Sequence, residues 1–573
     1  MRAWPFFPLI AVLAAQAQTS EVTTREETPT FQSSVNLVRV PVVVRDKQGQ
    51  AVGSLRKEDF HLTDRGKPQE ITQFTIEGSA VPKPAAKPST PEEVPWAPAT
   101  GGSKLVAPTR FVAFVFDDVH LKNEDLMNAR VAALKHIEQG IPPQERVALL
   151  TLSGSVTLEF TDDAAKFRET LMKVAPVPPR VHFPPASFYV ADTWENRENE
   201  DPRSLVLAMQ TQVTIDCLHL QTSGGAPAQA AGGTQGQAAS IAQDTLREVA
   251  NEGMSDAKNA FRILNNIVRL LGSMPGDRTM ILVSPGMYLS DELQKELGEA
   301  IDRATRLGVV INTLDARGVY TIDPTADIPN CRLTSPQTEQ DFAKYDHEAI
   351  TAQGLVLGNL AYSTGGTALA QNDFVSEFNR LASPPEYVYY LGFYPKDLKP
   401  DGKFHEIKVA LANGKGLSLQ ARKGYWAPSH LEDAAATATR EIGEAVFARD
   451  ELRDVPIDIH TQFYKTSADD AKVKVTAHLD IRQLALRKLS DDRNHNDITL
   501  VCALFDRNGN YVKGTQKVVE LRLKDENIER RRSLGITVNS DLDVKSGAYM
   551  IRVVARDAEG NQMAATNGVV EIP

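Results

Sequence analysis

Four residues that could do chemistry follow apolar, strand-like segments: Asp117, Asp118, His120 and Asp315. The first three come directly after Phe111–Phe116, which is apolar without alternation, as in a strand buried on both faces. Asp315 follows the similar segment Val309–Leu314. Carboxylates gathered at one sheet edge could hold Mg²⁺ or Ca²⁺, or activate a water molecule. They could equally satisfy a turn and the N-terminus of the next helix, with no chemistry at all.

Strand-like and helix-like segments alternate across residues 109–428. Apolar strand patterns occur at 110–117, 146–153, 156–160, 280–283, 309–314 and 387–393. Helical patterns occur at 124–139, 164–174, 257–271, 291–306, 349–362 and 374–381. This alternation predicts an α/β domain with a Rossmann-like open sheet, mostly parallel, and helices on both faces. Asp117 and Asp315 would both lie at the carboxyl edge of that sheet, where open sheets bind ligands.

An insertion interrupts this domain at residues 178–245. Its first part, 178–215, mixes proline, aromatic and charged residues without a clear period. Its second part, 221–240, is a low-complexity run of Ala, Gly, Gln and Ser, which predicts disorder. A long insertion in a compact domain is more often functional or linker-like than neutral, so we expect this one to contribute to binding.

The flanking regions are rich in strand patterns. Residues 33–79 predict a small β-rich domain, and the Pro-rich stretch 80–108 predicts a linker. A connecting helix is predicted within 429–451. The last segment, 452–573, alternates in several places and contains Asp- and Gly-bearing turns, which predicts an antiparallel β-sandwich. The 573 residues are too many for a single core, in agreement with this division into several domains.

The N-terminus has the pattern of a secretory signal peptide, residues 1–17. Arg2 is followed by the short apolar run Phe6–Ala15 and by a small-x-small site that predicts cleavage near Ala17–Gln18. No later stretch reaches about 18 uninterrupted apolar residues, so the sequence predicts no membrane span. We therefore expect the mature protein to be periplasmic or secreted.

The net charge and the cysteines limit the classes of partner. A formal net charge of -11 argues against nucleic acid and anionic membranes as general partners, because both need a basic surface. The chain contains Cys217, Cys331 and Cys502. Cys502 lies in a core-like strand, whereas Cys217 and Cys331 lie in loop-like stretches. A Cys217–Cys331 disulfide is plausible in an oxidising compartment, and no Cys/His spacing indicates a zinc site.

Several motifs resemble one known family. They are FVAFVFDDVHL, RVALLTLSG, MILVSPG, LAYSTGGTAL and YYLGFYPKDLKPDGKFHEIKVAL, in this order. Together with the N-terminal VPVVVRDKQGQAVGSLRKEDFHLTDRGKPQEI, they resemble the acidobacterial VWFA-related family of exported proteins, over about residues 33–428. The resemblance implies that the 109–428 domain is similar to a von Willebrand factor type A domain.

Type A domains often hold a divalent cation through an Asp-x-Ser-x-Ser motif and a Thr and an Asp from two later loops. Asp117 matches the first Asp, but Val119 and Leu121 stand at the two Ser positions. Ser284-Pro285-Gly286 stands where the later Asp turn is expected, and the insertion replaces the Thr loop. Since one ligand of five remains, we expect a degenerate metal-ion-dependent adhesion site and no cofactor. An unusual Mg or Ca site at Asp117, Asp118, His120 and Asp315 is the alternative.

These observations favour an exported, non-enzymatic binding protein that uses a type A-like domain for protein–protein or surface interaction, with a protein or cell-surface partner. A metal-dependent hydrolase and a structural envelope component are the alternatives on the same scaffold. The sequence contains no metalloprotease helix motif, nucleophile elbow or P-loop that would favour the first of these.

Overall fold

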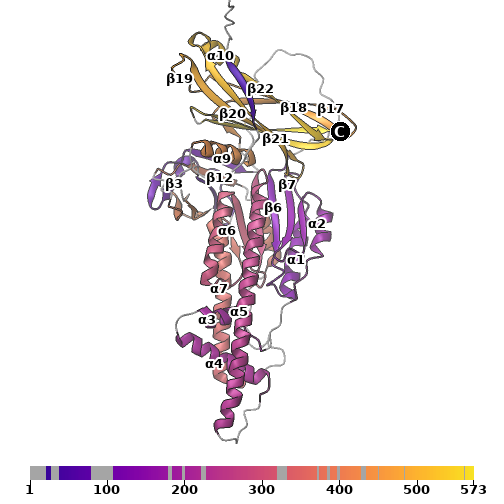
Figure 1. The fold of residues 1–573 in the computed structure, drawn as a ribbon, viewed down its shortest axis with the longest axis vertical. Coiled ribbons are helices and arrows are strands. Elements are labelled where there is room, and N and C mark those ends of the chain that lie inside the picture. The colour runs from indigo at the N-terminus through magenta and orange to yellow at the C-terminus, as the bar shows by residue number, and fades with distance from the viewer. Residues whose placement is uncertain are drawn as a thin grey trace, which may run out of the picture. The chain divides into compact units, whose positions relative to one another are not determined.

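A computed structural model describes most of the chain in two compact units. The described residues are 21–27, 38–48, 50–78, 107–178, 184–196, 200–220, 228–318, 332–370, 373–383, 387–396, 401–427, 434–448, 451–482, 484–560 and 562–573. One unit comprises Phe31–Arg449 with Phe505–Tyr511, and the other comprises Met1–Thr30, Asp450–Leu504 and Val512–Pro573. The chain is a mixed α/β, multidomain protein, as the sequence predicts (Figure 1).

A six-stranded sheet forms the centre of the first unit. Its order is β11-β10-β9-β6-β7-β8. The strands are β6 (Arg110–Phe116), β7 (Glu145–Thr151), β8 (Thr157–Thr161), β9 (Asp277–Val283), β10 (Val309–Leu314) and β11 (Ala368–Leu369). Neighbours from β7 to β11 pair in parallel, and only the edge strand β8 runs antiparallel. Parallel pairing brings the carboxyl ends of β6, β9 and β10 to one edge of the sheet.

Helices cover both faces of this sheet because successive side chains of a strand point to opposite sides. Val112, Phe114 and Phe116 share one core with α1 (Asn123–Ile137), α2 (Ala164–Leu171) and α8 (Phe374–Ala382). Phe111, Ala113 and Val115 share the other core with α5 (Ala228–Gly272), α6 (Gln294–Arg306) and α7 (Pro336–Thr364). The short helix η2 (Asp291–Leu293) precedes α6. Burial on both faces explains why Phe111–Phe116 shows no apolar–polar alternation.

A pair of smaller sheets is built from two distant parts of the chain. The N-terminal elements are β2 (Val38–Arg45), η1 (Lys57–Asp59), β3 (Phe60–Asp64), β4 (Lys67–Gln69) and β5 (Gln73–Gly78). Their partners are β12 (Tyr387–Phe393), β13 (Phe404–Leu411), β14 (Ser418–Ala421) and β15 (Gly424–Trp426). The orders β14-β2-β12-β5 and β15-β13-β3-β4 mix both parts, and the two sheets share one apolar core.

This pairing corrects two predicted boundaries. The sequence predicts a separate domain at 33–79 and assigns 387–428 to the α/β domain, yet the strands of these segments form common sheets. Tyr389 shows why: it is fully buried and packs against Phe60 and Phe74. A few short N-terminal strands cannot bury their apolar face alone, so they need the later strands. Most of the predicted linker, 80–108, lies outside the described residues.

The insertion is helical where the structure describes it. It forms α3 (Phe188–Asn196), α4 (Glu200–Cys217) and the first half of the 45-residue α5. The prediction of disorder for 221–240 is therefore wrong from Ala228 onward. Ala238, Ala242 and Leu246 are buried at a spacing of four residues, so the end of this low-complexity run leads into an apolar helical stripe. In Figure 1, α4 and the first half of α5 lie beyond the end of the central sheet.

The second unit is a two-sheet β structure with one shared core. Its elements are β16 (Leu452–Arg453), β17 (Ile457–Lys465), β18 (Asp470–Leu479), β19 (Arg487–Lys488), β20 (Asn494–Asp506), β21 (Tyr511–Leu523), η3 (Asp525–Asn527), α10 (Ile528–Leu534), β22 (Ile536–Lys545), β23 (Gly547–Asp557) and β24 (Met563–Ile572). The N-terminal strand β1 (Val22–Glu27) joins it by antiparallel pairing with β21, which the sequence did not indicate. Helix α9 (Ala434–Phe447) occupies the predicted connecting segment.

None of the helices that the structure describes combines the length and the apolar composition that are needed to cross a membrane.

Candidate functional site at the carboxyl edge of the central sheet

Backbone hydrogen bonds fix the ends of three neighbouring strands of the central sheet. The Asp117 N–H donates to the Val283 carbonyl, the Ser284 N–H to the Leu314 carbonyl, and the Asp315 N–H to the Leu369 carbonyl. Each strand end is thereby tied to the next, from β6 through β9 and β10 to β11. The structure thus places Asp117, Ser284 and Asp315 at successive strand ends along one edge, as expected for parallel strands.

Asp117 is fully buried and fully hydrogen-bonded within the protein. Its Oδ1 accepts the His120 backbone N–H at 3.0 Å, and its two oxygens lie 2.9 and 3.0 Å from His120 Nδ1. Its Oδ2 also accepts the hydroxyl of Ser284 at 2.6 Å. Ser284 in turn accepts the Gly286 N–H at 2.9 Å, in a turn where Gly286 has a φ of +85°. The carboxylate therefore connects the loop after β6 to the loop after β9.

Asp117 and His120 form a buried ion pair, with pKa values displaced in opposite directions. Burial opposes ionisation of Asp117, but the charge of and hydrogen bond from His120, together with Ser284, hold its pKa below the ordinary value. Burial also disfavours the imidazolium of His120, yet the Asp117 carboxylate, with Asp256 and Asp118, raises its pKa. The His120 side chain keeps 26% exposure, so the pair reaches solvent on the histidine side only.

Asp118 is also fully buried, but its partners come from the loop after β7. Its Oδ1 accepts the Ser153 N–H at 2.9 Å, and its Oδ2 accepts the hydroxyls of Ser153 at 2.5 Å and Ser155 at 3.0 Å. Its backbone carbonyl accepts the Val177 N–H at 2.7 Å. Three donors from the protein thus satisfy this buried carboxylate. Asp118 is a structural anchor between two loops.

Asp315 is paired with a neighbouring arginine instead of the other acids. Arg317 donates to it from Nε at 3.0 Å and from Nη2 at 2.8 Å, a two-point ion pair, and from its backbone N–H at 3.1 Å. The remaining Nη1 of Arg317 donates to Gln353 Oε1 on α7 at 2.9 Å. This pair neutralises the acid locally and ties the end of β10 to α7.

The four residues of the alternative metal site consequently have three separate sets of partners. Within the ranges that the structure describes, no group of three or more His, Cys, Asp or Glu side chains could hold a metal ion. The alternative site at Asp117, Asp118, His120 and Asp315 is not assembled, because hydroxyls, an imidazole and a guanidinium already engage the carboxylates. Sequence reasoning missed Ser153 and Ser155 as partners; their position at the end of β7, the strand next to β6, was the available signal.

The insertion contacts this edge through the loop after β9. The hydroxyl of Tyr288 donates to the buried Asp192 of α3 at 2.7 Å. The rings of Phe188 and Tyr189 pack edge-on against Tyr288, with centroids 5.2 and 5.1 Å apart. Gly253 of α5 permits the close approach of Phe188, since a Cβ there would lie 2.3 Å from the ring. The loop that holds Ser284 is therefore braced by the insertion.

Cys217, at the end of α4, is disulfide-bonded and buried beside Val213. Cys331 lies outside the described residues, so the Cys217–Cys331 pairing stays a prediction. Cys502 is a free, buried thiol in β20, where burial raises its pKa to about 12 and leaves it unreactive.

Comparison with known proteins gives distant structural likenesses alone: no family model and no curated protein matches the chain. An aerotolerance-related membrane protein from Bacteroides fragilis is 10% identical with a TM-score of 0.20, over 47% of this chain and 96% of that one. The conserved hypothetical protein BatB from Bacteroides thetaiotaomicron is 11% identical with a TM-score of 0.18, over 48% and 99%. A β-glucuronidase from Bacteroides uniformis is 10% identical with a TM-score of 0.14, over 34% and 20%. Scores this low carry no conclusion about function.

Proposed function

We propose that this chain is an exported, non-enzymatic binding protein. Its central domain is similar to a type A domain with a degenerate metal site, and its mature form is periplasmic or secreted. The observation that carries the proposal is the internal saturation of the carboxyl edge. Asp117, Asp118 and Asp315 each have their oxygens engaged by side chains of the same chain. Among the described residues of this edge, the three acids engage donors of the same chain and do not converge on a shared site, which favours binding over catalysis.

The helical insertion supports a binding function for this edge. It adds α3, α4 and half of α5 at the carboxyl edge and is braced against the loop after β9. Leu205 on α4 is 59% exposed and Leu355 on α7 is 63% exposed. Exposed apolar side chains of this kind can contribute to a protein interface. We infer a protein or cell-surface partner that docks on these helices.

The proposal is tested by immobilising the mature protein and measuring what it retains from an envelope fraction of the source cells. The double variant Leu205→Glu/Leu355→Glu should lose at least about nine-tenths of a specific partner, since a charge at an interface centre costs more than 1.4 kcal/mol. The matched control is Leu534→Glu on α10, where the leucine is 57% exposed in the other unit. Equal retention by all three proteins would contradict the proposal.

A hydrolase on the same scaffold is the second candidate, and one observation favours it. Asp117 holds Nδ1 of His120, which is the arrangement that orients a general base. A purified protein that hydrolyses ester or phosphoester probes, and loses this activity in His120→Gln, would favour the hydrolase over the binding protein. A structural envelope component, the third reading, would instead form large assemblies in sedimentation.

A further inference from the structure

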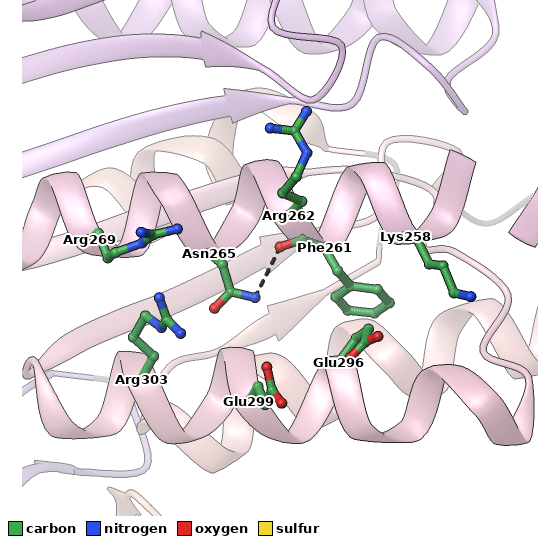
Figure 2. Close-up of a pocket in the computed structure, with 8 residues that line it drawn as sticks. All are labelled: Lys258, Phe261, Arg262, Asn265, Arg269, Glu296, Glu299 and Arg303. Carbon is green, nitrogen blue, oxygen red and sulfur yellow. Dashed lines mark hydrogen bonds between the residues drawn. The ribbon is translucent and has the colours of Figure 1, made fainter. Parts of the chain in front are cut away.

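A cavity of about 280 Å³ lies between α5 and α6, away from the carboxyl edge already described. It is lined by Lys258, Phe261, Arg262, Asn265, Arg269, Glu296, Glu299 and Arg303. Figure 2 shows Arg303 extending from α6 toward the side of α5 that carries Asn265 and Arg269. Ligand pockets usually enclose about 300–1,000 Å³, so this cavity lies just below that range and would take only a small molecule.

The cavity has an excess of positive charge in a protein of formal net charge -11. Four cations and the carboxylates of Glu296 and Glu299 line it, but Arg262 extends away from α6 and donates to Asn259 of its own helix at 2.7 Å (Figure 2). Lys258 is paired with Glu292, outside the cavity, at 2.6 Å. Arg269 donates to Asn266 of its own helix at 2.5 Å. Arg303 lies near enough to Asp302 to act on it electrostatically, but neither arginine forms an ion pair with an acid among the described residues. An oxyanion would stabilise these two guanidinium groups.

The wall of the cavity contains an acceptor without a donor. Asn265 uses its Nδ2 to donate to the Phe261 carbonyl at 3.1 Å. Its Oδ1 is buried and accepts no hydrogen bond from the described residues. A buried, unpaired amide oxygen is unfavourable, so a ligand hydroxyl that donates to it would gain more than at an exposed site. The ring of Phe261 adds an apolar surface beside this oxygen.

We propose that this cavity binds a small hydroxylated organic anion, a phosphate ester or carboxylic acid of a sugar-like polyol. Arg269 and Arg303 bind the oxyanion, and the Asn265 Oδ1 accepts a hydroxyl. The polyol lies along Phe261, and the carboxylates of Glu296 and Glu299 accept further hydroxyls. This site goes beyond the proposed function, because it shares no residue with the carboxyl edge or with the exposed leucines of α4 and α7.

Titration calorimetry on the full chain tests the site with glucose 6-phosphate, glucuronate and neutral glucose as probes. We expect at least one of the two anions to bind with a Kd below about 1 mM, and glucose to bind at least tenfold more weakly. The anion that binds more tightly shows whether the site prefers a phosphate or a carboxylate group. If neither anion binds, or if glucose binds as tightly as the better anion, the proposal is wrong.

Variants locate the binding site. Arg303→Gln and Arg269→Gln should each weaken the better anion about tenfold or more, since each removes a charge-assisted hydrogen bond. The matched control is Arg380→Gln on α8, an exposed arginine on the opposite face of the central sheet, which should leave the Kd unchanged. Asn265→Ala should weaken the anion while the melting temperature shows that the variant folds. Equal losses in the Arg380 control and the cavity variants would indicate nonspecific charge attraction and would overturn the proposal.

Discussion

The carboxyl edge of the central sheet and the α5/α6 cavity differ in how far their charges are satisfied. At the edge, Asp117, Asp118 and Asp315 are buried and each is bound by donors from its own chain. In the cavity, Arg269 and Arg303 form no ion pair with an acid among the described residues. Residue type and position are sufficient to suggest a binding site from the sequence. A charged side chain that has no partner within the protein is the better indication that a ligand can bind there. The predictions below separate the two regions.

The largest expected effect belongs to Asp118→Ala. This change leaves the Ser153 N–H and two hydroxyls without their acceptor in a fully buried place. We expect a loss of about 3–5 kcal/mol in the free energy of unfolding, the cost of breaking a buried charged network. Urea denaturation of the variant measures it. The control is Asp163→Ala, an exposed N-cap of α2, which should cost about 1 kcal/mol. Equal losses in both variants would mean that Asp118 is not an anchor.

His120→Gln should lower the free energy of unfolding by less than Asp118→Ala does, about 2–3 kcal/mol at pH 6. The loss is smaller because the histidine is partly exposed while its partner Asp117 is buried. The loss should depend on pH. Since the pKa of His120 is raised, its stabilisation is complete below about 6.5 and is lost as the pH rises through the raised pKa. Since the pKa of Asp117 is lowered, its contribution is present above about 3.9 and is lost as the pH falls through the lowered pKa.

The measurement is urea denaturation of wild type and His120→Gln at pH 6 and pH 9. The difference between the two proteins should become smaller as the pH rises through the raised pKa of His120 and the imidazolium loses its proton. A difference that stays constant from pH 6 to pH 9 would show that the histidine contributes by packing alone and that no ion pair forms.

The smallest effect on stability should come from the cavity. Arg303→Gln removes a guanidinium that forms no ion pair among the described residues and lines the same cavity as Arg269, so the free energy of unfolding should change by less than about 0.5 kcal/mol. A slight increase in the free energy of unfolding would agree with the removal of charge repulsion between Arg303 and Arg269. The same denaturation assay checks this, with Arg317→Gln as the contrasting variant, since Arg317 holds Asp315. A loss above about 2 kcal/mol at Arg303 would show that its charge is structurally used.

Much of the central domain could be predicted because its signals are local. The unbroken apolar run Phe111–Phe116 indicated a strand buried on both faces, and the ends of such strands placed Asp117 and Asp315 on one edge. By contrast, β2 pairs with β12 across more than three hundred residues, and no local pattern encodes a partner at that separation.

Two other features, the helical part of residues 221–240 and the hydrogen-bond network of Asp118, could not be predicted from the sequence, for different reasons. Composition suggested disorder for 221–240, but residues 228–240 belong to α5, where Ala238 and the following Ala242 are buried at helical spacing. The network around Asp118 depends on which loop lies beside which, so Ser153 and Ser155 became meaningful after the strand order was known. Hydrogen-bond partners at the end of a neighbouring strand can be predicted only after the order of the strands in the sheet is known.

The most direct test of the central claim is the melting temperature of the mature protein in EDTA and then in millimolar Mg²⁺, Ca²⁺ and Mn²⁺. The account predicts no shift, because hydrogen bonds within the protein already occupy the carboxylates at the edge. A cation present at about 100 times its dissociation constant would stabilise the protein by about 2.7 kcal/mol, a shift of a few degrees. Such a shift, abolished in Asp117→Ala, would contradict the account and would reopen metal-dependent adhesion and metal chemistry at this edge.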